Sequence, residues 1–270
     1  MRRLLFFCLG IALVATASGV VVLVHKYDGA GRSVGKGTKH SPAVTPRCRA
    51  GEVDLASRRV SLVAFVRTRA TVYGRPGGAR LTTLPRLSRS FVATSRRGVP
   101  TVLTALSEVR ASDCRALWYR VRLYGKPGVS GAQEGYVRAS AVALAEVRTR
   151  VLVDLSSRQL TLYRDGAPVL DATVAVGAPS TPTPRGRFLV RERIRITDSG
   201  SAYGAAAIAL SAFSEKLIYW PQGGPVAIHG TNDPGSIGKA ASHGCIRVGA
   251  SDLKSLFARV QIGTPVEIVE

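Results

Sequence analysis

The 270 residues allow one large or two modest domains, and the 46% hydrophobic content is ample for packed cores. A formal net charge of +21, carried mostly by arginine, makes nucleic acid the first partner to consider. The arginines are scattered rather than gathered in one arm, however, and aromatic residues make up only 6% of the chain. Retention at another anionic surface fits this charge equally well, so the N-terminal sequence has to decide between the two.

An uncharged run from Leu4 to Val24 follows the positively charged residues Arg2 and Arg3. A helix of this length crosses the core of a bilayer, and the preceding arginines favour a cytoplasmic N-terminus. We therefore predict that residues 1–25 form a signal-anchor (transmembrane) helix and that the rest lies outside the cytoplasm, in the cell envelope. The sequence Ala15-Thr16-Ala17 also resembles a signal-peptidase site, so cleaved secretion stays open. Export argues against nucleic acid as the partner.

Residues 26–48 are rich in Gly, Lys, Ser, Thr and Pro and show no apolar periodicity, which is typical of a flexible linker. Cys48 ends this stretch, and Cys114 follows in the next. Disulfides persist outside the cytoplasm, so we predict a disulfide between Cys48 and Cys114; two unpaired thiols are the alternative.

Residues 49–147 contain short strand-like runs separated by Gly/Pro turns, a pattern that predicts a small β-barrel. The Trp-Tyr-x-Val and Gly-Tyr-Val elements resemble those of bacterial SH3-like domains. Binding of wall glycan or peptide and a purely positioning role are equally open for this segment. The runs are Ser61–Val66, Ala70–Tyr73, Pro100–Leu103, Trp118–Leu123 and Gly135–Val137.

Residues 148–270 are also mostly strand-like. Val151–Leu155 reads as a buried strand, and Gln159–Tyr163 and Pro168–Val176 are expected to form a hairpin through the turn Asp165-Gly166. The prolines in Ser180–Gly186 require a loop.

Two later stretches of this segment give different signals. Ile194–Ser214, with its glycines and alanine run, is expected to be a loop or a mobile cover. Ser251 is a plausible N-cap for a short helix over Asp252–Val260, and Gly263 follows its end. One helix among many strands predicts a mostly-β fold.

The chemistry is concentrated between Val226 and Arg247. A short apolar strand ends at His229, a turn follows, and Ser242-His243-Gly244-Cys245 then places a thiol beside two imidazoles. A thiol near neutral pH needs a base or a cation to become a good nucleophile. A buried cysteine or a metal site would be the alternatives, but no second cysteine lies nearby to complete a zinc site. We therefore predict a catalytic cysteine and no metal or other cofactor.

These residues resemble the signature of the L,D-transpeptidase family (YkuD-type catalytic domain). The matching positions are His229-Gly230-Thr231 and Ser242-His243-Gly244-Cys245-Ile246-Arg247. Pro184–Phe188 resembles the Pro-x-Gly-x-Phe element of the family, and Gly263–Val266 resembles its closing strand. The resemblance covers residues 148–270 and implies a β-sandwich-like catalytic domain with the site at one end.

The residues and the resemblance together assign the roles. Cys245 is the expected nucleophile and His229 the general base, and the resemblance implies that the Gly230 carbonyl orients the ring of His229. The backbone N–H groups of His243, Gly244 and Cys245 are expected to form an oxyanion hole, and the His243 side chain to support the pocket.

Arg247 and Ser242 are expected to bind substrate, Arg247 through a carboxylate of the substrate; a structural ion pair of Arg247 is equally open. If His229 takes the thiol proton, we expect a thiolate–imidazolium pair in the resting site near neutral pH.

The resemblance implies a peptidoglycan L,D-transpeptidase. Cys245 would form an acyl-enzyme with a stem tetrapeptide, release D-alanine and transfer the acyl group to an amine, which gives a 3→3 cross-link. L,D-carboxypeptidase activity and wall-protein anchoring by the same acyl-enzyme are alternatives, as is a non-catalytic wall-binding protein. The expected partners are peptidoglycan stem peptides, the cell wall and, through the N-terminal helix, the membrane.

Overall fold

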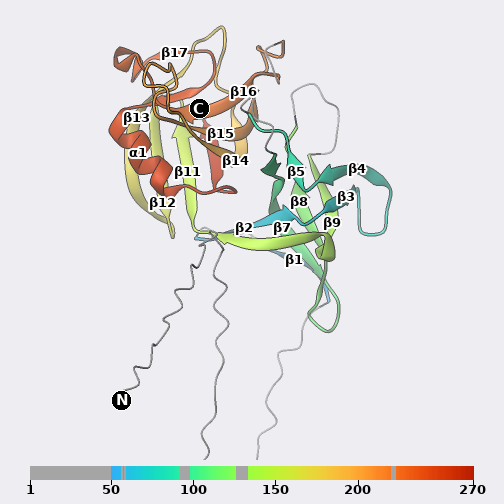
Figure 1. Ribbon diagram of the computed structural model, residues 1–270. Helices are drawn as coiled ribbons and strands as arrows, with labels where there is room; N and C mark the ends of the chain where they lie inside the picture. Colours follow the sequence, from blue (N-terminus) through green and yellow to red (C-terminus); the bar gives the residue numbers. More distant parts are fainter. Residues whose placement is uncertain (1–49, 56, 58, 92–97, 126–132, 220–222) are drawn as a thin grey trace, which may run out of the picture. The chain divides into compact units, whose positions relative to one another are not determined.

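The computed structural model describes residues 50–55, 57, 59–91, 98–125, 133–219 and 223–270, all of which belong to one compact unit, Pro46–Glu270 (Figure 1). The predicted N-terminal helix, the linker and Cys48 lie outside these residues. Within them, no helix is both long and apolar enough to cross a bilayer. Cys114 is disulfide-bonded, and its pairing with Cys48 stays a prediction.

The first half of the described chain forms an antiparallel, barrel-like sheet with the strand order β10-β2-β7-β8-β9-β3-β4, and β1 also pairs with β7. Its core holds fully buried side chains such as Ala64, Val72, Val121 and Val137. The strands are β1 (Gly51–Asp54), β2 (Ser61–Val66), β3 (Arg69–Tyr73), β4 (Arg80–Pro85), β7 (Val102–Arg110), β8 (Ala116–Arg122), β9 (Glu134–Arg138) and β10 (Val142–Val147), with the small pair β5 (Leu87–Ser88) and β6 (Val99–Pro100) beside them.

The second half forms a mixed sheet with the order β12-β11-β19-β14-β15-β16-β18-β13-β17, and an additional pairing of β12 with β13 closes it into a ring. The helix α1 (Ala250–Arg259) packs Leu253, Leu256 and Phe257 into the core of this sheet. Its strands are β11 (Thr149–Asp154), β12 (Gln159–Arg164), β13 (Ala167–Gly177), β14 (Gly186–Arg195), β15 (Ala206–Phe213), β16 (Pro225–His229), β17 (Ala240–Ser242), β18 (Ile246–Val248) and β19 (Pro265–Val269).

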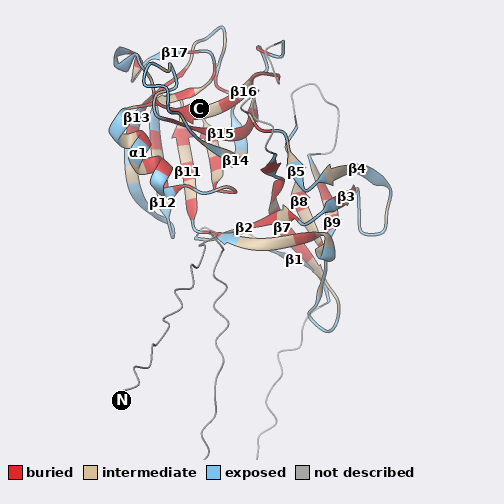
Figure 2. Ribbon diagram, viewed as in Figure 1, coloured by how far each residue is buried: buried red, intermediate tan, exposed pale blue. Residues whose placement is uncertain are grey.

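The predicted mostly-β class is confirmed, with one α-helix among the described residues. The hairpin between β12 and β13 turns at Asp165 and Gly166, whose φ angles of 52° and 88° suit a two-residue turn. The expected loop over Ile194–Ser214 holds for residues 196–205. It is wrong for the strand residues on either side, because β14 reaches Arg195 and β15 covers Ala206–Phe213. This strand is buried along nearly its whole length (Figure 2), so it lacks the alternation that marks a half-exposed strand.

The predicted start of the helix is also wrong. Gly249 is the N-cap residue, with extended backbone and no side-chain cap, and Ser251 lies inside the helix. Asp252 in the first turn and Arg259 in the last complement the helix dipole.

The two sheets share side-chain contacts. Leu189 of β14 is fully buried in one cluster with Val63, Val102 and Val147 of the barrel-like sheet. The carboxylate of Glu192, also on β14, accepts hydrogen bonds from Ser90 Oγ at 2.6 Å and from the Phe91 N–H at 2.8 Å. The segment around Ser90 is therefore hydrogen-bonded to β14, which lies two strands away from β16, the strand that ends at His229.

Candidate active site

Parallel pairing of β16 with β18 brings the two halves of the signature together. Ile228 pairs with Ile246, and His229 pairs with Arg247. Cys245 directly precedes β18, so it lies beside the last residues of β16, and its thiol has a backbone hydrogen bond with Ala227. The strand register thus brings the expected nucleophile and base close together on two neighbouring strands.

The ring of His229 is buried, with 5% of its surface exposed, and is held by its own neighbour. Nδ1 lies 2.5 Å from the Gly230 carbonyl oxygen. A carbonyl oxygen only accepts hydrogen bonds, so Nδ1 carries the proton and donates it. Nε2 is then the nitrogen with a free lone pair, which is what a general base requires.

Burial shifts the pKa of both groups towards their neutral forms. Burial is the largest of the effects that together lower the pKa of His229 to about 4; the hydrogen bond to Gly230 opposes it, and the charge of Arg247 adds a smaller lowering. Burial also raises the pKa of the Cys245 thiol, which the hydrogen bond with Ala227 and the charge of Arg247 only partly offset. Both shifts favour a thiol and a neutral imidazole in the resting site over the expected thiolate–imidazolium pair.

The turn before Cys245 is built on the hydroxyl of Ser242, which is 2% exposed. This hydroxyl accepts the Gly244 N–H at 3.1 Å and donates to the Cys245 carbonyl at 2.5 Å. Ser242 thus shapes the turn, and the substrate contact expected for it is not what its geometry supports. The Gly244 N–H, one of the three expected for an oxyanion hole, is therefore already engaged by Ser242.

Gly244 has a φ of +107°, a conformation that L-residues with side chains rarely adopt. A Cβ at this position would lie 3.4 Å from the Pro182 carbonyl oxygen. The turn therefore needs glycine for its backbone angle, whereas the approach to the neighbouring loop is an ordinary contact.

That neighbouring loop supports the nucleophile turn directly, which the sequence did not reveal. The Ser242 carbonyl accepts hydrogen bonds from the Ala178 N–H at 2.8 Å and from Thr181 Oγ1 at 3.1 Å. Thr183 Oγ1 in turn accepts the Gly177 N–H at 2.8 Å. The threonines that precede the two prolines, Thr181 before Pro182 and Thr183 before Pro184, were the available signal.

Tyr203 is a second residue that sequence reasoning missed. Its ring meets the His229 ring edge-on, with centroids 4.7 Å apart. Tyr203 lies between β14 and β15, in the stretch whose glycines and alanines predicted a loop or a mobile cover. Its aromatic ring does lie against the histidine. Tyr203 itself is 49% exposed, so it borders solvent and the buried base at once.

The remaining predicted residues lie around this pair. Arg247 is half-buried, and among the residues that the structure describes it forms no ion pair with a carboxylate. Its charge is thus available to a substrate carboxylate. His243 is exposed on the turn. Within the described ranges, no group of three or more His, Cys, Asp or Glu side chains is arranged to hold a metal.

Comparison with known proteins identifies relatives of this segment. The family model of the L,D-transpeptidase catalytic domain (YkuD) matches residues 148–268. A putative L,D-transpeptidase YkuD of Bacillus licheniformis is 36% identical over 152 residues, which cover 54% of this chain and 83% of the relative. The Bacillus subtilis protein of the same description is 37% identical over 118 residues, which cover 44% of this chain and 64% of the relative.

Solved structures of similar proteins carry the same description. The NMR structure of the catalytic domain from Enterococcus faecium L,D-transpeptidase is 30% identical, with a TM-score of 0.33, over 45% of this chain and 96% of that one. The structure of LD transpeptidase LdtMt1 in complex with imipenem is 20% identical, with a TM-score of 0.40, over 69% of this chain and 100% of that one.

Proposed function

The chain belongs to the L,D-transpeptidase family, and we propose that it is a peptidoglycan L,D-transpeptidase that uses Cys245 as its nucleophile and His229 as its general base. The observation that carries the proposal is the fixed tautomer of His229. Its Nδ1 donates a hydrogen bond to the Gly230 carbonyl at 2.5 Å, so Nε2 is free to take the thiol proton. The pairing of β18 with β16 brings Cys245 close to this ring.

The reaction follows from these groups in two half-reactions. As the Cys245 sulfur attacks the donor carbonyl, the thiol proton passes to Nε2 of His229. The tetrahedral oxyanion collapses to a thioester, the peptide bond breaks, and the released D-alanine amine takes the proton from His229. An acceptor amine then attacks the thioester, its proton passes through His229 to the departing sulfur, and the thiol is restored with a new amide bond.

The neutral resting state suits this sequence. A neutral imidazole is a proton acceptor at physiological pH, because burial keeps its pKa near 4. The charge pair then forms only while the substrate carbonyl is being attacked.

The cellular setting is part of the proposal. We place the catalytic segment outside the cytoplasm at the cell envelope, attached or secreted through the N-terminal residues, with peptidoglycan stem peptides as donor and acceptor. The barrel-like sheet of β1–β4 and β7–β10 is proposed to be an SH3-like domain that positions the catalytic segment at the wall.

The decisive experiment incubates the purified full chain with disaccharide-tetrapeptide muropeptides and follows the products by mass spectrometry. We expect loss of D-alanine and formation of cross-linked dimers, both abolished by Cys245→Ala. Loss of D-alanine without dimers would make the protein a carboxypeptidase that uses the same acyl-enzyme. Binding without any loss of D-alanine in the wild-type protein would refute the enzyme and leave a wall-binding scaffold.

A further inference from the structure

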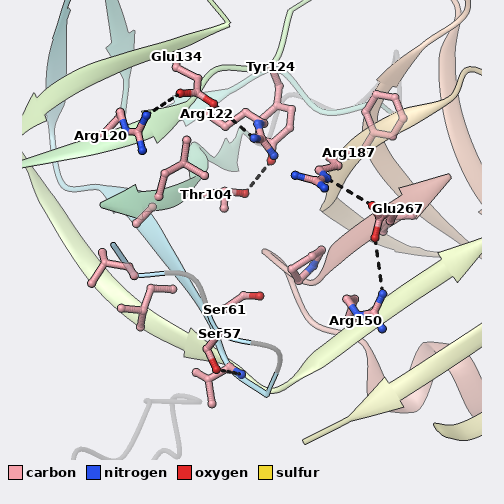
Figure 3. Close-up of a pocket in the computed structure, with 18 of the residues that line it drawn as sticks. Ser57, Ser61, Thr104, Arg120, Arg122, Tyr124, Glu134, Arg150, Arg187 and Glu267 are labelled. Carbon is pink, nitrogen blue, oxygen red and sulfur yellow. Dashed lines mark hydrogen bonds and ion pairs between the residues drawn. The ribbon is translucent and has the colours of Figure 1, made fainter. Parts of the chain in front are cut away.

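A cavity of about 360 Å³ lies away from the active site, between β7–β9 of the barrel-like sheet and β11, β14 and β19 (Figure 3). Neither Cys245 nor His229 nor Arg247 is among the residues that line it. Its size falls in the range of about 300–1,000 Å³ that is usual for small-molecule pockets. The catalytic proposal therefore gives this cavity no role.

The barrel side of the cavity presents one carboxylate between two arginines. Glu134 Oε1 lies 3.3 Å from Arg122 Nη2, and its other oxygen lies 3.4 Å from Arg120 Nη1. Arg122 and Glu134 are direct partners across β8 and β9. The strand ladder thus places these two residues side by side on one face of the sheet.

The opposite side repeats the arrangement. Glu267 lies 3.3 Å from Arg187 Nε and 3.6 Å from Arg150 Nη1, and Arg187 and Glu267 are partners across β14 and β19. Figure 3 shows the two groups facing each other, with Thr104 and Tyr124 between them. The cavity is therefore bordered by two rigidly placed arginine–glutamate–arginine groups.

Among the residues that line the cavity, four arginines meet three carboxylates, those of Asp54, Glu134 and Glu267. Arg120 is also paired with Glu52 at 3.1 Å and with Asp54 at 3.8 Å. The other three, Arg122, Arg150 and Arg187, have only Glu134 and Glu267. Three guanidinium groups thus share two carboxylates, although the whole network of four arginines and four carboxylates is balanced in charge. The 3.3–3.6 Å contacts are longer than the about 2.7–2.9 Å of a strong charge-assisted hydrogen bond.

The rest of the lining is apolar or neutral. Leu62, Phe188 and Val266 supply an apolar surface. Tyr124 and Thr104 join their hydroxyls at 2.6 Å and add neutral polar groups. Apolar walls with a few fixed polar groups are typical of ligand pockets, and a guanidinium selects a carboxylate or a phosphate because it offers two parallel donors.

We propose that this cavity binds the oxyanion of a small wall fragment, a carboxylate carried on a sugar, through Arg122 and Arg150. The choice of a wall fragment rests on the proposed function, whereas the preference for an oxyanion rests on the cavity alone. A phosphate-bearing group shares the same chemistry and is the second source to be tested.

The test titrates the full chain carrying Cys245→Ala by calorimetry with three probes: N-acetylmuramic acid for the carboxylate, glycerol 1-phosphate for the phosphate, and N-acetylglucosamine as the uncharged control. We expect N-acetylmuramic acid to bind, N-acetylglucosamine not to bind, and the affinity to fall as salt is added. Binding of glycerol 1-phosphate alone would support the oxyanion site but make its ligand a phosphate instead of a carboxylate. If neither anion binds, or if the uncharged sugar binds as well as the anions, the proposal is overturned.

Variants locate the site. Arg122→Gln should weaken binding about 10- to 100-fold, the usual cost of a lost charged hydrogen bond, and Glu134 would still be paired with Arg120, so the fold is preserved. Glu134→Gln should strengthen binding, because it removes the carboxylate that competes for Arg122; a damaged fold would not have that effect. Arg115→Gln removes an equal charge from a side chain that is 70% exposed elsewhere and serves as the matched control.

Unchanged affinity in both Arg122→Gln and Arg150→Gln would overturn the proposal. The titration needs no turnover, so its failure is distinguishable from a failure of the muropeptide reaction. Equally, cross-linking by the wild-type protein would stand even if this cavity bound nothing.

Discussion

Gly204 lies directly against Gly230, the residue whose carbonyl holds the ring of His229. A Cβ at Gly204 would come within 2.9 Å of the Gly230 Cα, and the φ of +64° at Gly204 is one that glycine adopts without strain. This close approach brings the neighbouring Tyr203 to the edge of the His229 ring. The position of the Tyr203 ring and the orientation of the His229 ring thus both depend on the backbone contact between Gly204 and Gly230.

We therefore expect Gly204→Ala to lower kcat by about 10- to 100-fold, since small displacements of catalytic groups have effects of this size. The added methyl group must displace either the cover or the Gly230 carbonyl. Steady-state kinetics with a muropeptide donor measure the effect. Gly200→Ala is the matched control in the same stretch, because a Cβ there meets only Asp198 Oδ1 at an ordinary 3.5 Å. Equal kcat values for the two variants would contradict the role of the contact.

The nucleophile turn gives a second prediction. Thr181→Val removes the 3.1 Å hydrogen bond to the Ser242 carbonyl and keeps the shape of the side chain, while the Ala178 N–H still satisfies that carbonyl. We expect a loss of about 1 kcal/mol in the free energy of unfolding and a larger relative loss in kcat than in KM, because Thr181 positions the turn of Cys245. A change confined to KM would instead indicate a substrate contact.

Much of this site could be predicted from the sequence because its chemistry is local. The order of residues from Ile228 to Arg247 specifies a strand end, a turn and a second strand, so His229 and Cys245 could be named together. The strand pairing that joins them was not visible. Neither was the use of Ser242, because a serine beside a nucleophile reads equally as a substrate contact or as part of the turn.

The missed elements share a physical cause. The run Ala206–Phe213 is buried on both faces, and small residues that fill a closed core lack both the alternation and the branched side chains on which a strand prediction depends. Tyr203 and Thr181 reach the site through tertiary contacts with Gly230 and Ser242. No spacing along the chain encodes such contacts.

The choice of base between the two histidines gives a third prediction. A carbapenem should acylate Cys245 and add its mass there, and His229→Ala should slow this acylation by about 10²–10⁴-fold, the usual contribution of a general base. His243→Ala should cost less, because that side chain is exposed on the turn. Mass spectrometry over time measures both rates. A larger loss in His243→Ala would mean that His243 is the base.

The buried base also predicts how stability depends on pH. In the unfolded chain a histidine titrates near its ordinary pKa of about 6.5, whereas burial lowers the pKa of His229 in the folded protein to about 4. Between these values the unfolded state binds a proton that the folded state does not. The free energy of unfolding therefore falls as the pH drops from about 6.5 to about 4, by at most about 3 kcal/mol from this residue.

Denaturant unfolding between pH 4 and pH 7 measures this slope, and His229→Gln should flatten it because glutamine does not titrate. Asp154, whose pKa is lowered by hydrogen bonds from Ser157 and Ser156, loses its contribution only below its ordinary value of 3.8, so it does not obscure the window. His243→Gln changes an exposed histidine and should leave the slope in place. A slope that survives in His229→Gln would show that the His229 ring is not held neutral by burial, and the proton acceptor proposed for Cys245 would then have to be reassigned.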